Sequence, residues 1–250
     1  VPICSFVLKN GRATEKALCF RLSEFKGGME VQKQKVLEAI NNKNCMYFYE
    51  TDESNFKKIP GSPIAYWASE NIFKDFEEGK PIGNIAEVKR GMTTSDNNRF
   101  LRYWAEVSWE KVKINARDKD EALESRAKWF PYSKGGGYRK WYGYQEYLID
   151  WEDDGKNVIE FAKKINKSYT RTIVNISYYF MPSVGFCYIT SGPFSMRWIP
   201  EGFLYDSGGP GMFADEITRI KLIACMNSKP AQLILKMISP TINLQIADVV

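Results

Sequence analysis

The most chemically suggestive part of the sequence is residues 129–142, which read WFPYSKGGGYRKWY. Aromatic rings, three consecutive glycines and three cations stand together here, in what we expect to be a polar-flanked loop. Such a loop can bring its backbone close to a ligand, stack rings on flat surfaces and neutralise phosphates, which favours nucleic acid over a small metabolite. The alternative is a surface loop whose rings cap a local core, because aromatic residues often anchor loops.

A second candidate segment is the loop expected at residues 91–99, which is rich in hydroxyl and amide side chains. Asn suits adenine and Arg suits guanine in the major groove, because each presents paired hydrogen-bonding groups. We expect the two loops to flank a DNA duplex, one contacting bases and the other phosphates. Ordinary turn chemistry at Asn97-Asn98 and a flexible tip at the triple glycine are the alternatives. The candidate DNA-binding residues are Thr93, Thr94, Ser95, Asn97, Asn98, Arg99, Lys134, Gly135, Gly136, Tyr138, Arg139 and Lys140.

The sequence contains no histidine. Ser-His-Asp triads, Cys-His dyads and histidine-bound metals are therefore excluded within it, and we assign no catalytic residue and no metal ligand. The five cysteines are widely spaced without a CxxC pair, and most have apolar neighbours. They predict buried thiols in a reducing cytoplasm and not a zinc site. No apolar run is long enough to span a bilayer and no signal peptide opens the sequence, so no membrane partner is expected.

The net charge of +5 is local. Residues 81–140 hold 13 Lys/Arg and 8 Asp/Glu, whereas the remainder holds 22 of each. A localised basic excess is the expected footprint of a polyanion partner, although a surplus of this size also arises by chance.

Two further function classes stay open. A magnesium-dependent nuclease would use an E-x-K pattern with an upstream aspartate, although a solvated strand face explains the same residues. They are Glu87, Lys89 and Asp75. A carbohydrate-binding module would use an aromatic platform, against which the interleaved cations argue. Its rings would be Trp129, Trp141, Tyr142 and Tyr144.

Strands and helices are expected in runs and not in strict βαβ alternation, so the predicted class is α+β, a mixed sheet with flanking helices. Strands are expected at residues 45–50, 82–89, 100–107 and 146–151 and within 171–206, with residues 1–8 and 17–22 paired as a hairpin and 241–246 extended. Helices are expected at residues 31–42, 62–79, 118–129, 157–165, 215–226 and 229–238. Ser62-Pro63 and the Asp118/Glu121 pair supply two of the predicted helix starts.

Several segments resemble the PglX family, the adenine-specific DNA methyltransferases of BREX phage-defence systems. They are VPICSFVL (1–8), RLSEFKG (21–27), IPGSPIAYWAS (59–69), GNIAEVKRGMTTSDNNRFLR (83–102), KWFPYSKGGGYRKWYG (128–143) and SPTINLQIADV (239–249). Residues 81–250 also resemble target recognition domains of type I restriction specificity subunits. Such a domain typically begins with a strand and a Thr-containing loop, and ends with a helix and a phrase such as Asn227-Ser228-Lys229.

The resemblance implies a division of labour. Family members bind S-adenosylmethionine with a Gly-containing loop and hold the flipped adenine with an Asn-Pro-Pro-Tyr-like motif, and neither occurs here. We therefore expect a C-terminal piece of a longer polypeptide. Residues 1–60 would be the end of the methyltransferase domain with a connector, and residues 61–250 the target recognition domain. The expected partners are double-stranded DNA and the missing catalytic domain. This piece would need no cofactor, whereas the parent enzyme would use S-adenosylmethionine.

Overall fold

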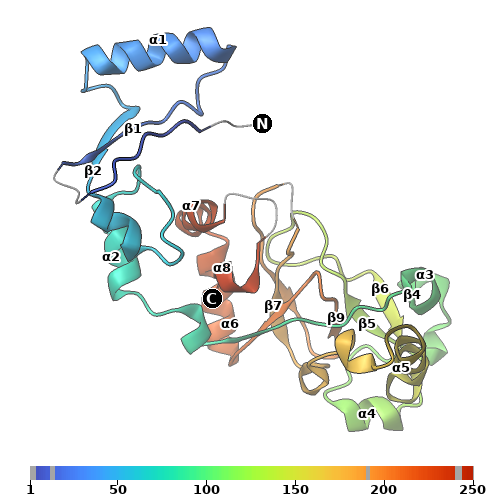
Figure 1. The fold of residues 1–250 in the computed structure, drawn as a ribbon. Helices are drawn as coiled ribbons and strands as arrows, with labels where there is room; N and C mark the ends of the chain where they lie inside the picture. The colour runs from blue at the N-terminus through green and yellow to red at the C-terminus, as the bar shows by residue number, and fades with distance from the viewer. Residues whose placement is uncertain (1–3, 12–14, 190–191, 240–243, 250) are drawn as a thin grey trace. The chain divides into compact units, whose positions relative to one another are not determined.

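The computed structural model describes residues 4–11, 15–189, 192–239 and 244–249. The chain forms two compact units, Val1–Lys80 and Pro81–Val250. Helices occur beside largely antiparallel strands, so the fold class is α+β, as predicted (Figure 1). The sequence predicted a boundary after residue 60, between the end of the methyltransferase domain and the target recognition domain. That assignment concerns function and stays a prediction.

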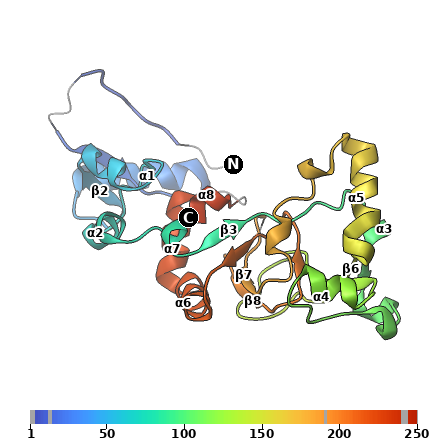
Figure 2. The ribbon, with the colours of Figure 1, turned by 90° about the horizontal axis from the view of Figure 1, so that it is seen from below.

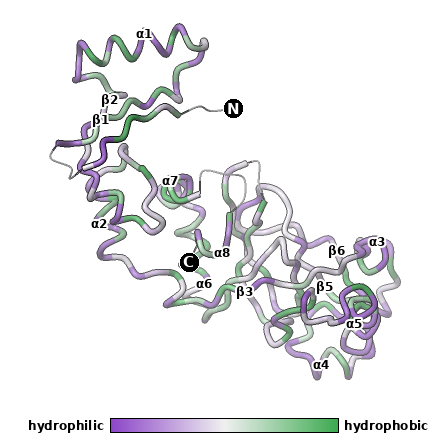
Figure 3. Tube along the Cα trace, in the orientation of Figure 1, coloured by the Kyte–Doolittle hydropathy of each residue, from purple (hydrophilic) through white to green (hydrophobic). Residues whose placement is uncertain are grey.

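The first unit is a two-stranded sheet with two helices. It contains β1 (Ala17–Phe20), α1 (Gly28–Asn41), β2 (Phe48–Thr51) and α2 (Glu70–Glu78). β1 pairs antiparallel with β2, and the rings of Phe20 and Phe48 lie 5.5 Å apart across the pair. Hydrophilic and hydrophobic residues alternate along α1, as Figure 3 shows. Among its described residues, α1 nevertheless buries only Ala39, so much of its apolar surface faces solvent.

Two predictions for this unit are wrong. The predicted hairpin paired residues 1–8 with 17–22, but β1 pairs with β2 and the described residues 4–8 form no strand. The helix predicted from Ser62-Pro63 begins only at Glu70, after Ser69. Ser62 has φ 49° and the Ala65 N–H bonds back to the Pro63 carbonyl, so this stretch is a turn. The apolar spacing that suggested the helix belongs to α2.

The second unit contains two four-stranded sheets. The first sheet has the order β3 (Glu87–Lys89), β10 (Gly211–Phe213), β7 (Ser183–Gly185) and β8 (Arg197–Ile199), and all its pairs are antiparallel. The second sheet has the order β4 (Leu101–Tyr103), β6 (Tyr147–Asp150), β5 (Trp129–Ser133) and β9 (Leu204–Tyr205). Only β5 and β9 run parallel among its pairs. The helices are α3 (Asn97–Phe100), α4 (Lys119–Glu124), α5 (Glu152–Asn166), α6 (Glu216–Met226), α7 (Lys229–Ile238) and α8 (Ile246–Val249).

Each sheet has its own helices and its own core. Val184 and Met212 of the first sheet share a buried cluster with Leu222 of α6 and Leu235 of α7. In the second cluster, Phe130 and Ile149 of the second sheet are joined by Val158 and Ala162 of α5, among others. Figure 2 shows α5 near β6 and α6 beside β7, and α4 packs against α5. Helices and sheet therefore bury one another's apolar faces, as layered domains require.

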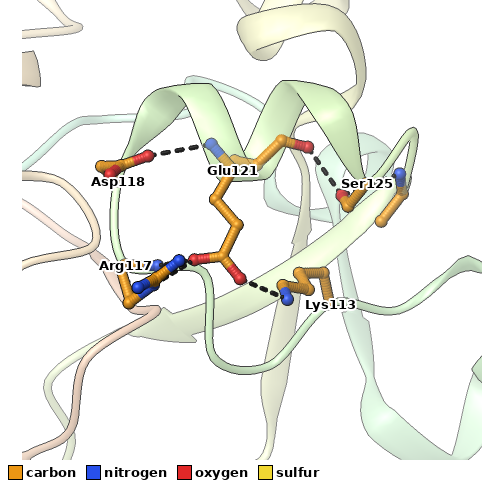
Figure 4. Close-up of polar contacts among 7 residues, drawn as sticks. Lys113, Arg117, Asp118, Glu121 and Ser125 are labelled. Carbon is orange, nitrogen blue, oxygen red and sulfur yellow. Dashed lines mark hydrogen bonds and ion pairs between the residues drawn. The ribbon is translucent and has the colours of Figure 1, made fainter.

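The start of α4 confirms a cap that the sequence predicted. The Asp118 carboxylate accepts a hydrogen bond from the Glu121 N–H at 2.8 Å, which satisfies a donor that the first helical turn leaves free. The Glu121 carboxylate then accepts from the Lys113 ammonium at 2.7 Å and from the Arg117 N–H and guanidinium, as Figure 4 shows. These bonds, the one from Lys113 first, lower the pKa of Glu121 to about 2.

Other expectations in this unit need correction. The stretch predicted as an aromatic loop begins as β5, so only residues 134–142 are loop. The predicted strand at 82–89 is a short turn of 3-10 helix at Ile82–Asn84 followed by β3, and the one at 100–107 stops at Tyr103. An extended stretch was predicted at 241–246. Residues 241–243 lie outside the described residues, and α8 begins at Ile246.

The helices predicted at 157–165, 215–226 and 229–238 are present as α5, α6 and α7. The cysteines are not buried as predicted: Cys4 and Cys225 are exposed, and the other three are half-buried, with all five thiols free. On α6, Leu222, Ile223 and Met226 lie on the buried side of the helix. Ala224 and Cys225 lie between them in sequence and face the solvent side, so Cys225 is exposed. Among the residues that the structure describes, no helix has the length and apolar character needed to cross a membrane.

Candidate nucleic-acid interface

The loop before α3 is held in place by its own polar side chains. The Asp96 carboxylate accepts from the Arg99 N–H at 3.1 Å and so caps α3. The buried Thr94 hydroxyl donates to the Asn97 amide oxygen at 2.6 Å. This bond fixes the Asn97 side chain while its amide NH₂ remains on the exposed side of the loop. Thr94 therefore positions a neighbour, and its burial keeps it from touching a ligand directly.

Residues from both predicted loops meet at one open depression of about 340 Å³. We call it the polar groove. Asn97 and Asn98 of α3 line it together with Lys134, which follows β5. The remaining lining residues are Leu101, Arg102, Tyr103, Glu106 and Tyr147. The sequence alone predicted that these two segments flank one ligand, and the fold places Asn97, Asn98 and Lys134 around a common space.

Two stacked tyrosines form part of the groove wall. Tyr103 and Tyr147 are cross-strand neighbours on β4 and β6, with ring centroids 4.8 Å apart and hydroxyl oxygens 3.0 Å apart. The hydrogen bond between them, together with burial, raises the pKa of Tyr147 to about 12, so the Tyr147 hydroxyl stays neutral near neutral pH. The Lys134 ammonium lies 5.1 Å from the centre of the Tyr147 ring. It takes part in no ion pair within 4.0 Å among the described residues, although its charge also acts on the carboxylate of Asp206, whose pKa burial raises and Lys134 lowers.

Arg102 is a groove residue that the sequence analysis did not select. Its Nη1 donates to the carbonyls of Asn98 and Leu101, each at 2.6 Å. Two backbone acceptors therefore hold the guanidinium beside the exposed asparagines. The resemblance segment 83–102 contained this arginine, but nothing in the residue spacing distinguished it from other surface cations.

Several predicted residues of the first loop lie elsewhere. The Thr93 hydroxyl donates to the Ser207 Oγ at 2.9 Å, which ties the loop to the turn before β10. Ser95 is exposed and has φ 62°, which marks a tight turn. The Arg99 guanidinium packs over the Phe161 ring at 4.9 Å on α5. None of these three lines the polar groove.

The triple glycine packs against other parts of the unit and is not a free tip in the structure. A Cβ on Gly135 would stand 3.1 Å from the Gly208 carbonyl, and one on Gly136 would stand 2.9 Å from the Tyr144 ring. Both glycines also have positive φ, 84° and 118°, which side chains disfavour. Glycine is therefore required here for close packing, whatever else the segment does.

Arg139 and Tyr144 form a cluster with a third residue that sequence analysis missed. The guanidinium groups of Arg139 and Arg197 each lie 5.0 Å from the centre of the Tyr144 ring. Arg197 is 1% exposed, and no hydrogen bond to its Nε is present. Burial lowers the pKa of Arg197. Arg139 and Tyr138 are exposed and so remain accessible to a ligand.

Lys140 has a structural partner. Its ammonium donates to the Asn227 carbonyl at 2.5 Å, at the C-terminal end of α6, where a cation compensates the helix dipole. The buried Asn227 amide donates to the Met196 carbonyl at 2.8 Å and accepts from the Met196 N–H at 2.9 Å. Ser228 caps α7 through the Ala231 N–H. The Asn227-Ser228-Lys229 phrase thus joins α6, α7 and β8, and Lys140 belongs to this junction and not to the polar groove.

The residues of the two alternative functions have other contacts in the structure. The Glu87 carboxylate pairs with Lys89 at 2.6 Å and accepts from the Tyr178 hydroxyl. Asp75 lies in α2 of the first unit, and no group of three acidic, Cys or His residues suited to a metal occurs in the described ranges. Of the four proposed platform rings, Trp129 lies in β5 and Tyr144 packs against two arginines as above. Only Trp141 and Tyr142 are exposed.

Two curated proteins match the chain over nearly its whole length, and both are named as adenine-specific methyltransferases. PglX of Lacticaseibacillus casei (strain Zhang) is 37% identical over 231 residues, which cover 92% of this chain. BrxX of Escherichia coli O9:H4 (strain HS) is 38% identical over 254 residues, which cover 100% of this chain. The chain is thus related to the PglX and BrxX family, as the resemblance indicated. It spans 19% of the length of each of these relatives. No protein-family model matches the chain.

Proposed function

We propose that this chain is the DNA sequence-recognition part of an adenine-specific DNA methyltransferase of a restriction-modification or BREX-type phage-defence system. The family relationship supports this assignment, because both matched relatives carry that enzyme name. The parent polypeptide would use S-adenosylmethionine. Neither the cofactor loop nor the Asn-Pro-Pro-Tyr-like motif occurs in these 250 residues, so we assign catalysis to another part of the parent.

The observation that carries the proposal is the polar groove. It combines two exposed asparagine side chains, an arginine held by backbone carbonyls and a lysine without an ion pair within 4.0 Å among the described residues. The one acidic side chain in its lining, Glu106, accepts a hydrogen bond from the Tyr103 N–H. Asn97 and Asn98 would contact base edges, because the side-chain amide matches the donor and acceptor pair of adenine. Lys134 would contact a backbone phosphate, because an ammonium is a point charge without base preference. Arg139 and Tyr138 would extend the phosphate contacts beyond the groove.

The first unit would dock against the remainder of the parent polypeptide. Within the described part of Val1–Lys80, few apolar residues are buried, whereas Phe6, Met29, Leu37 and Met46 are exposed. Apolar surface of this extent usually marks a contact with another protein surface. Five free thiols suit a reducing compartment, and we place the parent in the cytoplasm.

The proposal is tested by exchanging segments in full-length BrxX of Escherichia coli O9:H4 (strain HS). The BrxX segment that aligns with Pro81–Val250 is replaced by this chain's Pro81–Val250, and methylated adenines are mapped by sequencing in cells. The methylated site is expected to change. An exchange of the segment aligned with Val1–Lys80 is the matched control and should leave the site unchanged.

An active hybrid that methylates the original site would contradict the proposal. If the hybrid is inactive, purified chain is titrated with duplexes in which single positions are varied. Asn98→Ala should then relax preference at one position by a factor of roughly 5 to 150, the range for one good base contact. An unchanged preference profile would count equally against the proposal.

A further inference from the structure

A second depression lies on the other face of the sheet that borders the polar groove. Side chains alternate between the two faces of a strand. On β5 and β6, Phe130 and Ile149 point into the core shared with α5, so their neighbours Pro131 and Leu148 point to the opposite face. Pro131 and Leu148 line a depression of about 380 Å³ on that face, which we call the aromatic pocket.

Exposed rings form much of the wall of the aromatic pocket. Trp104 and Trp109 lie with ring centroids 6.2 Å apart and planes at 49°. They are 51% and 52% exposed, and Tyr142, which also lines the pocket, is 63% exposed. Leu148 and Phe203 beneath the rings are buried, yet each of the three rings leaves more than half of its surface exposed, so packing accounts for only part of their area. Such rings offer flat faces to a ligand.

The polar groups of the pocket are two side-chain amides, which can both donate and accept, and one carboxylate, which accepts. They belong to Asn115, Gln145 and Glu201, and no lysine or arginine lines the pocket. The Gln145 amide nitrogen donates to the Trp198 carbonyl at 3.1 Å, which fixes that side chain. The Glu201 carboxylate is exposed and makes no ion pair within 4.0 Å in the described part of the chain, although it interacts at longer range with the charge of Arg117, which pairs with Glu121. The pocket therefore suits a flat, uncharged ring that carries a hydrogen-bond donor, and it does not suit a phosphate.

We propose that the aromatic pocket binds an unstacked nucleobase that carries an exocyclic amine, such as adenine or cytosine. The rings would stack on the base, and Glu201 would accept a hydrogen bond from the amine, as acidic side chains do with cytosine. This inference rests on the proposed DNA-binding function. The pocket is of the right order for one such group, since ligand pockets begin at roughly 300 Å³. Tyr103 of the polar groove and Trp104 of the pocket are adjacent in sequence, so the two sites meet at the end of β4.

The test uses the complete 250-residue chain. Its affinity is measured by fluorescence anisotropy for single-stranded oligo(dA), oligo(dC) and oligo(dT), and for a duplex. Trp104→Ala and Trp109→Ala should each weaken oligo(dA) binding by on the order of ten-fold, the effect of losing one stacked base. Trp141→Ala is the matched control, because Trp141 is equally exposed but lies outside the pocket. Glu201→Gln should reduce the preference for oligo(dA) and oligo(dC) over oligo(dT).

Trp104→Phe keeps a ring and should retain part of the affinity even if the alanine variants fold poorly, as judged by thermal melting. The inference is overturned if the folded pocket variants bind oligo(dA) as tightly as Trp141→Ala does. It is also overturned if the chain binds cellohexaose in a salt-insensitive manner that Trp104→Ala abolishes, which would identify a carbohydrate site. One outcome would contradict this inference and still support the proposed function. In that outcome Lys134→Ala weakens duplex binding, whereas the pocket variants bind both the duplex and oligo(dA) as tightly as the unmodified chain does. Absence of binding to every nucleic acid would contradict both.

Discussion

Replacing Lys134 with alanine tests whether this lysine contacts a DNA phosphate or only stabilises the fold. The Lys134 ammonium lies over the Tyr147 ring at the edge of the polar groove and forms no ion pair within 4.0 Å among the described residues. Burial raises the pKa of Asp206, and the charge of Lys134 opposes that rise from a longer distance, so the ammonium is not tied to the carboxylate and can meet a phosphate. We therefore expect the variant to fold normally and to bind duplex DNA more weakly.

The size of the effect follows from the number of charges removed. One ammonium neutralises one phosphate, and each such contact contributes about 0.9 to the slope of log affinity against log salt. The slope for Lys134→Ala should therefore be less steep than for the unmodified chain by roughly 0.9. A fourfold rise in salt should then cost the unmodified chain about 3.5-fold more affinity than it costs the variant.

The assay is a series of anisotropy titrations of a labelled duplex at increasing salt. Lys140→Ala is the matched control, because its ammonium caps the Asn227 carbonyl at the end of α6. The control should keep the original slope and lose thermal stability instead. Lys134→Met keeps the apolar stem over Tyr147 without the charge, and it should behave as Lys134→Ala does. Equal slopes for Lys134→Ala and the unmodified chain, or an effect confined to Lys140→Ala, would refute the assignment of Lys134 to a phosphate.

Three further predictions concern stability. Asn227→Ala should lower the free energy of unfolding by about 2–4 kcal/mol in denaturant titrations, because it leaves the buried N–H and carbonyl of Met196 unpaired; a loss below the error of the titration would contradict this account. Glu121→Gln should make the free energy of unfolding depend less on pH between pH 4.5 and 2. The reason is that the Glu121 carboxylate, with its pKa lowered to about 2 from 4.5, stabilises the fold above pH 4.5 and loses that effect as the pH falls toward 2. Identical pH profiles for the two proteins would argue against the network in Figure 4. Gly91→Ala should cost at least about 2 kcal/mol, because its Cβ would stand 1.9 Å from the Tyr205 carbonyl, whereas Gly11→Ala meets no atom within 4 Å and should be neutral.

Local signals in the sequence were enough for several elements. Asp118 caps α4 as predicted, and the helices expected at 215–226 and 229–238 are α6 and α7. These features depend on contacts within a few residues, so the chain order contains the information. The side-chain chemistry of the two loops led us to expect that both flank one ligand; the fold brings Asn97, Asn98 and Lys134 to one groove, and their contact with DNA stays a prediction.

Other outcomes depended on contacts between distant segments. Pro131 and the glycines after it favoured a loop, yet residues 129–133 form β5 because β6 and β9 pair with them from both sides. Lys134 and Lys140 are the same residue type within one loop, and only the position of Asn227 makes one a free charge and the other a cap. Residue order determined the caps, the helices and the candidate segments, because these follow from neighbours along the chain. Tertiary structure alone decided which cations remain unpaired and which rings face solvent, because pairing and burial depend on residues brought together by folding.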